Sequence, residues 1–330
     1  MRIFRGPVTD VGQHGEVDRV DRVDRIDGVD RSLVRRLTVA SGLALIGAGL
    51  CYLLLVRTSL GQRFDNAAFL GSQQSLSTTR AADTRQLRHI TADSFAVVLL
   101  VLVAIGVLRR RVWLGVAAAA AAALAVLGTD ALKYWVLTRP TLTTSDAVVP
   151  AQTFPSGHTA TAVACALALM LVTAPRWRGV AAVVAGAYAW VTAAQVQTAG
   201  WHRPSDAIGA ALLAFACVAA VGAILARRRP VSTQSSGPHR IALGVLVALA
   251  AVDTAAAVWG LRKVLPRLGE NLGNVQTTAN IRHDAYLTGL SATVLVVILL
   301  VMALLLLAGR VDLDYTTPAR LPTTSRGADH

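Results

Sequence analysis

The sequence predicts an all-α polytopic membrane protein with eight transmembrane helices. Of its 330 residues, 54% are hydrophobic and only 15% are charged, whereas soluble domains carry roughly 25% charged residues. The mean hydropathy is +0.53. A soluble globule cannot bury this much apolar surface. The apolar residues also cluster in segments near the roughly 20 residues that a bilayer helix needs.

The chain begins with a polar segment, residues 1–36, that contains a repeated Val-Asp-Arg triplet. A period of three does not form a continuous helix face, so we expect a disordered or partly helical cytoplasmic tail. No apolar core of a signal peptide lies within the first 30 residues. The apolar spans then lie at about 37–56, 93–108, 112–137, 158–174, 180–199, 206–226, 240–260 and 286–309.

Arginines flank these spans in a regular way. Arg109 to Arg111 separate the second and third spans and predict a tight turn, and Arg227 to Arg229 follow the sixth span. With both termini in the cytoplasm, these and the other short basic clusters are all cytoplasmic, as the positive-inside rule expects. Four segments then face outward: about 57–92, 138–157, 200–205 and 261–285.

Polar residues collect at the outward ends of the spans. Lys133 lies at the end of the third span and Arg139 just beyond it. Ser156, Gly157 and His158 open the fourth span, and His202 and Asp206 lie where the fifth joins the sixth. Lys133 is one of only two lysines in an arginine-rich chain. All these residues lie on one side of the membrane in the predicted topology, so they can meet in one pocket.

This set of residues suits phosphoryl transfer. Fixed positive charge and the free N–H groups of a helix N-terminus bind phosphate oxygens. His202 and Asp206 are four residues apart, so both can lie on one side of a helix start. A carboxylate beside an imidazole orients the ring and leaves its other nitrogen free to attack phosphorus. His158 can then protonate the leaving oxygen.

With these motifs, the chain resembles the type 2 phosphatidic acid phosphatase (PAP2) superfamily of membrane lipid phosphatases. The family signature has three parts: Lys, six residues, Arg-Pro; then Pro-Ser-Gly-His; then Ser-Arg, five residues, His, three residues, Asp. The second part is intact at Pro155-Ser156-Gly157-His158, and the third retains His202 and Asp206. The first is one residue short, because five residues separate Lys133 from Arg139.

The resemblance covers residues 37–226, a six-helix core. It leaves two further transmembrane helices in residues 227–310 and a cytoplasmic tail at 311–330. It implies that His202 is the nucleophile and forms a phosphohistidine, that Asp206 orients it, and that His158 is the general acid. It also implies that Lys133, Arg139, Ser156 and the Gly157 N–H bind phosphate, and that no metal or other cofactor is needed.

The third motif departs from the family pattern, because Gln195 and Val196 occupy the positions of its Ser-Arg pair. A phosphate-binding arginine is therefore missing. Losing one charged donor costs roughly 2–4 kcal/mol of transition-state stabilisation if nothing replaces it. Gln195, Gln197, Thr198 and Arg203 are the neighbouring polar candidates.

The resemblance implies a lipid phosphate or diphosphate phosphatase at the outer face of the cytoplasmic membrane. Candidate substrates are a polyprenyl diphosphate, phosphatidate and phosphatidylglycerophosphate. A phosphotransferase that passes the phosphoryl group to a lipid or sugar hydroxyl, and a catalytically degenerate lipid-binding or scaffold relative, are alternatives. Nucleic acid is not an expected partner, since no basic groove with interleaved aromatic residues appears. The oligomeric state is left open.

Overall fold

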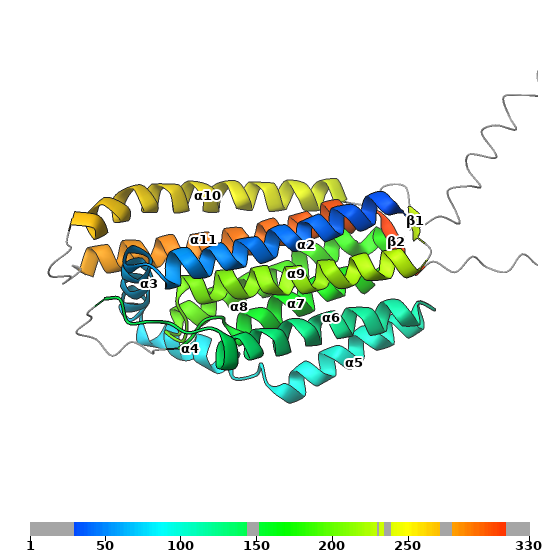
Figure 1. The fold of residues 1–330 in the computed structure, drawn as a ribbon, viewed down its shortest axis with the longest axis horizontal. Coiled ribbons are helices and arrows are strands. Elements are labelled where there is room, and N and C mark those ends of the chain that lie inside the picture. The colour runs from blue at the N-terminus through cyan, green and yellow to red at the C-terminus, as the bar shows by residue number, and fades with distance from the viewer. Residues whose placement is uncertain (1–29, 144–151, 230, 234–238, 271–278, 315–330) are drawn as a thin grey trace, which may run out of the picture.

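The computed structural model describes residues 30–143, 152–229, 231–233, 239–270 and 279–314. Long helices run side by side along one axis and form an elongated bundle (Figure 1). The first is α2, Arg31–Cys51, which continues without a break into the π-helical turn η1, Tyr52–Val56. It begins inside the segment expected to be a tail, because the side chain of Asp30 caps it by accepting hydrogen bonds from the N–H groups of Ser32 and Leu33.

Two shorter helices follow, α3 (Ser59–Ser72) and α4 (Ser77–Leu87), and both lie at the same end of the bundle (Figure 1). The remaining helices are α5 (Ala92–Leu108), α6 (Val112–Ala131) with the π-helical turn η2 (Leu132–Val136), α7 (Gly157–Val172), the 3₁₀ turn η3 (Pro175–Trp177), α8 (Arg178–Thr198), α9 (Pro204–Arg228), α10 (His239–Glu270) and α11 (Ala279–Ala308).

Each of the eight predicted spans coincides with a helix, and the all-α membrane-type fold is confirmed. Among the described residues, six helices are long and apolar enough to cross a membrane. The α4–α5 pair, bent by 57°, makes seven if it counts as one span. The helix α7 has 16 residues and is shorter than a full span. By length and composition, the described residues therefore contain six or seven candidate membrane spans and not the predicted eight.

The structure adds helices in two of the segments expected to face outward. The segment 57–92 contains α3 and α4, and helices α10 and α11 extend well into the segment 261–285. Two three-residue strands, β1 (Val231–Thr233) and β2 (Val311–Leu313), pair antiparallel at the far end of the bundle from α3 (Figure 1). Each strand is only three residues long, and neither was predicted from the sequence.

Small residues make up much of the core. Alanines of α6, α7, α8 and α9 are buried together with leucines and valines of α11. These small residues let the helices approach one another closely, so the core is packed with few large side chains, as in other membrane bundles. Helices α5 and α6 meet at the tight turn predicted at Arg109 to Arg111. They approach closely there, because a Cβ on Gly106 would lie only 2.6 Å from the Cα of Gly115.

Candidate active site

The predicted site residues lie at the end of the bundle that carries α3. Glycine makes the turn that brings His202 there. Gly200 has a φ of +71°, follows the last turn of α8 and donates its N–H to the carbonyl of Gln197. The chain then enters α9 at Pro204, a residue suited to the first helical position. Asp206 caps the new helix by accepting the backbone N–H of Arg203 at 2.9 Å.

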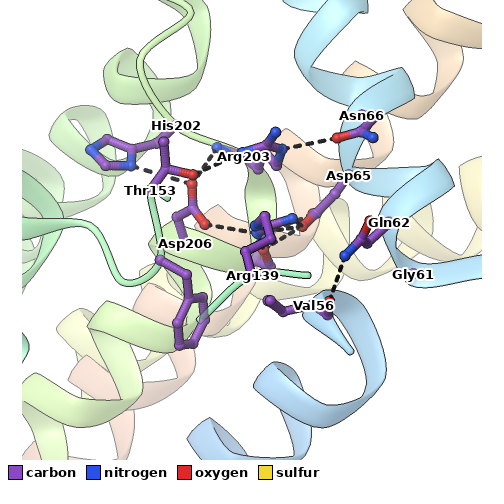
Figure 2. Close-up of polar contacts among 12 residues, drawn as sticks. Val56, Gly61, Gln62, Asp65, Asn66, Arg139, Thr153, His202, Arg203 and Asp206 are labelled. Atoms are coloured by element: carbon purple, nitrogen blue, oxygen red, sulfur yellow. Dashed lines mark hydrogen bonds and ion pairs between the residues drawn. The ribbon is translucent and has the colours of Figure 1, made fainter. Parts of the chain in front are cut away.

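His202 and Asp206 form the expected pair. The Nδ1 atom of His202 lies 3.3 Å from Oδ2 of Asp206, and both side chains are buried. The Asp206 carboxylate accepts a hydrogen bond best when Nδ1 carries a proton, which leaves Nε2 of His202 with a free lone pair. Figure 2 shows the His202 ring on one side of Asp206 and Arg139 on the other.

Arg139 is held between two carboxylates. Its Nη2 lies 3.1 Å from Oδ1 of Asp206, and both Nη atoms lie 3.2 Å from Oδ2 of Asp65, a residue of α3 (Figure 2). Its Nε is buried without a hydrogen-bond partner among the described residues. The arginine expected to bind phosphate therefore directs its two η-nitrogens at protein carboxylates.

Asp65 is fully buried and belongs to the same cluster. Ser205 donates its backbone N–H to Oδ1 of Asp65 at 3.2 Å and its hydroxyl to Oδ2 of Asp65. Burial raises the pKa of the Asp65 carboxyl above its ordinary value, the nearby Asp206 adds to the rise, and Arg139 opposes it. Two buried carboxylates thus share one guanidinium.

Arg203 also points toward α3. Its Nε donates to Asn66 at 3.0 Å and its Nη1 to Thr153 at 2.9 Å (Figure 2). The guanidinium packs over the ring of Phe69. Arg203 therefore fastens the start of α9 to α3 and to the chain before α7, and its charge is directed away from the His202 ring.

The Pro-Ser-Gly-His motif is tied to α9 through the main chain. The N–H of Ser156 donates to the backbone carbonyl of Asp206 at 3.0 Å. Ser156 is the N-cap of α7, and its hydroxyl accepts the N–H of Thr159. The N–H groups of Gly157 and His158 open the helix and have no intrahelical acceptor. A Cβ on Gly157 would lie 3.5 Å from Oδ1 of Asp130, an ordinary contact, so the Asp130 carboxylate lies beside this helix start.

His158 and Lys133 reach the same region. The ring of His158 meets the ring of Trp201 edge-on, with 5.2 Å between centroids. His202 and Lys133 lie near enough to His158 to interact with it electrostatically. Gln152 links the chain before α7 to η2 and to Arg139, because its side-chain amide donates to the carbonyls of Lys133 and Leu137 and accepts the N–H of Arg139. The structure therefore brings all seven predicted site residues to one end of the bundle.

Gln195 and Val196, which replace the Ser-Arg pair of the family pattern, face α4. Gln195 donates to Asp83 and Gln86 of α4 at 3.1 and 2.8 Å. Val196 is fully buried and packs with Leu87 of α4. Gln197 and Thr198 donate to carbonyls of their own helix. The four polar candidates considered from the sequence, Gln195, Gln197, Thr198 and Arg203, all donate hydrogen bonds to protein groups.

Residues 112–230 match the family model of the PAP2 superfamily. The resemblance seen in the motifs is confirmed for this part of the chain. The matched segment contains every predicted site residue, whereas Asp65, Asn66 and the helices α10 and α11 lie outside it. No curated protein and no solved structure matches the chain. The match places the segment in a phosphatase-type superfamily and identifies neither a substrate nor a reaction.

Proposed function

We propose that this protein is a membrane phosphatase that removes phosphate from a lipid phosphate or diphosphate through a phosphohistidine. The observation that carries the proposal is the buried His202–Asp206 pair beside the N-terminus of α7, inside the segment that matches the PAP2 superfamily. A buried carboxylate that orients an imidazole is the arrangement a histidine nucleophile needs.

In the first step, Nε2 of His202 forms a bond to phosphorus while the bond from phosphorus to the lipid oxygen breaks. His158 gives its proton to that oxygen, so the lipid leaves as an alcohol or as a monophosphate. Asp206 stabilises the positive charge that develops on the His202 ring. Lys133 and the N–H groups at the start of α7 stabilise the phosphoryl oxygens.

In the second step, water attacks the phosphohistidine. His158 takes the proton from the water, the N–P bond breaks, and inorganic phosphate leaves with His202 regenerated. The Arg139 guanidinium, paired with Asp65 and Asp206, fixes the orientation of the Asp206 carboxylate that holds the His202 ring.

A lipid substrate suits the position of the site. The site lies at the end of a bundle of apolar helices, next to η2, where Tyr134 and Trp135 are exposed. Aromatic residues of this kind favour the membrane–water interface. A headgroup can enter there while its tail stays in the bilayer. We propose that this end faces outward, because the short basic connections lie at the opposite end.

The test is phosphate release by the detergent-purified protein. The substrates are a polyprenyl diphosphate, phosphatidate and phosphatidylglycerophosphate, each with EDTA and without added metal. We expect release that survives EDTA and falls to background in His202→Ala. His283→Ala is the matched control, because His283 is an exposed histidine of α11. Substrate loss without inorganic phosphate would instead indicate transfer, and no turnover of any lipid would contradict the proposal.

A further inference from the structure

A second basic feature lies beside the candidate active site. Helix α4 forms one wall of a pocket of about 380 Å³, and Ala199 of the α8 end contributes to the lining. The polar side chains that line the pocket are three arginines and two hydroxyl residues: Arg80, Arg85, Arg88, Ser77 and Thr84. This combination of guanidinium groups and hydroxyls consists mostly of hydrogen-bond donors.

The pocket carries positive charge that the protein does not neutralise. Within the part of the chain that the structure describes, none of its three arginines forms an ion pair with a carboxylate. The acidic residue of α4, Asp83, accepts a hydrogen bond from Gln195. The Nε atom of Arg80 is buried and has no hydrogen-bond partner among the described residues. A buried, unpaired donor is costly unless a ligand satisfies it.

The pocket adjoins the chain segment that leads into the candidate active site. A Cβ on Gly200 would lie 3.4 Å from Nη2 of Arg80. The next residue, Trp201, packs with the apolar cluster of Leu87 and Val196 on one side and contacts the His158 ring. The Gly200–Trp201 turn therefore separates the pocket from His158 and His202.

We propose that this pocket binds a phosphate group, either on a lipid headgroup or as the free anion. Three guanidinium groups match the bidentate geometry and the charge of a phosphate, and Ser77 and Thr84 add neutral donors. The position of α4, at the end of the apolar bundle, is where a lipid headgroup would lie (Figure 1). Phosphate binding at this pocket does not require the chemistry proposed for His202.

The experiment measures how an anion protects individual arginines. His202→Ala protein in dodecyl maltoside is treated with phenylglyoxal, and modification of each arginine is followed by mass spectrometry. One arm adds inorganic phosphate, a second adds short-chain phosphatidate, and a third adds sodium chloride at the same ionic strength. We expect phosphate or phosphatidate to slow modification of Arg85 and Arg88, and sodium chloride to have little effect.

Arg80→Gln tests the role of the buried donor. We expect the concentration that gives half-protection of Arg85 and Arg88 to rise about tenfold or more, as the loss of one charge-assisted contact predicts. Arg176, exposed in η3, is the internal control and stays unprotected. Arg85→Gln, at an exposed position, repeats the test without disturbing a buried atom.

The two arms identify the ligand. Protection by phosphatidate at a concentration at least tenfold lower than that of inorganic phosphate assigns the pocket to a lipid headgroup, and equal protection assigns it to the phosphate group alone. Protection by neither, or protection unchanged in both variants, overturns the proposal. Because the protein carries His202→Ala, an absence of phosphatase activity in the wild type has no effect on these outcomes.

Discussion

Asp65 shows how one buried residue can complete a site that family motifs describe only in part. It lies outside the PAP2 match, yet it contacts Arg139 and Ser205. A carboxylate in this position cancels part of the charge of Arg139 and fixes the direction of its guanidinium. We therefore regard Asp65 as a positioning residue for Arg139.

The raised pKa of Asp65 predicts a pH dependence. In the folded protein its carboxyl holds a proton at pH values where the unfolded chain has lost it. The stability of the wild type relative to Asp65→Asn is therefore greatest below the ordinary carboxyl pKa of about 3.9 and falls as the pH rises through the raised pKa. The measurement is the thermal midpoint of both proteins in detergent between pH 4 and 7.

The matched control for this experiment is Asp93→Asn, at an exposed position of α5. Each unit by which the pKa is raised corresponds to about 1.4 kcal/mol of relative stability. A midpoint difference between wild type and Asp65→Asn that stays constant with pH, or that grows toward neutral pH, would contradict the raised pKa.

Val196 gives the second prediction at this scale. Val196→Arg restores the residue type of the family motif, but the side chain would enter the apolar cluster with Leu87, Ala199 and Ala207. An uncompensated buried charge costs about 3–5 kcal/mol, so we expect a large fall in the thermal midpoint and no gain in phosphate release. Val196→Ile, which keeps the site apolar, should lower the midpoint less than Val196→Arg does. Higher activity with an unchanged midpoint would show that the arginine reaches the active site.

The sequence could predict the residues whose spacing is local. His202 and Asp206 are one helical turn apart, and Ser156, Gly157 and His158 are consecutive, so a short motif reveals them. Asp65 could not be found in this way, because its partners Arg139 and Ser205 are far away in the sequence. Its only signal was an acidic residue in a segment with apolar residues at helical spacing.

At the scale of the element, α3 is the main helix that the sequence did not predict. Its buried residues include Phe64, Ala67 and Ala68, which pack with residues of α10 and α11. The segment is only 14 residues long and mixes these with polar side chains, so it lacks the apolar length of a span. Its stability comes from packing against α11, a contact that no local pattern encodes.

The contact between α3 and α11 depends on Gly71. A Cβ there would lie 2.0 Å from the backbone oxygen of Arg282 and 2.8 Å from Cβ of Tyr286. We expect Gly71→Ala to push α3 away from α11, to destabilise the protein by about 1–3 kcal/mol or more, and to lower phosphate release because Asp65 moves with α3. Thermal midpoint and specific activity are the two measurements.

Gly49→Ala is the control for this substitution, since a Cβ on Gly49 meets nothing within 4 Å. It should leave both measurements close to wild type. If Gly71→Ala lowered the midpoint but left the activity per folded molecule unchanged, the position of α3 would not matter to the site, and the role given to Asp65 would be wrong.

At the scale of the whole molecule, hydropathy located the long helices because a bilayer demands apolar length. Hydropathy did not reveal how the end of the bundle opposite the candidate active site is closed. There β2 places Asp312 3.0 Å from Arg109 and 3.6 Å from Arg111, and Arg178 donates to the carbonyls of Ala308 and Val311. The arginines used to predict orientation are thus also structural, and they lie together at the end that carries β1 and β2.

This separation makes the orientation testable. The basic residues at the β1–β2 end lie in the short connections between the long helices, which the positive-inside rule places in the cytoplasm. We expect the β1–β2 end to be cytoplasmic and the α4 end to face outward. In a background without Cys51, Cys165 and Cys217, Thr79→Cys should react with a membrane-impermeant maleimide in intact cells, and Arg176→Cys should react only after permeabilisation. Both positions are exposed, so burial does not bias the comparison. The reverse labelling pattern would move the site to the cytoplasmic face and exclude outer-leaflet lipids as its substrates.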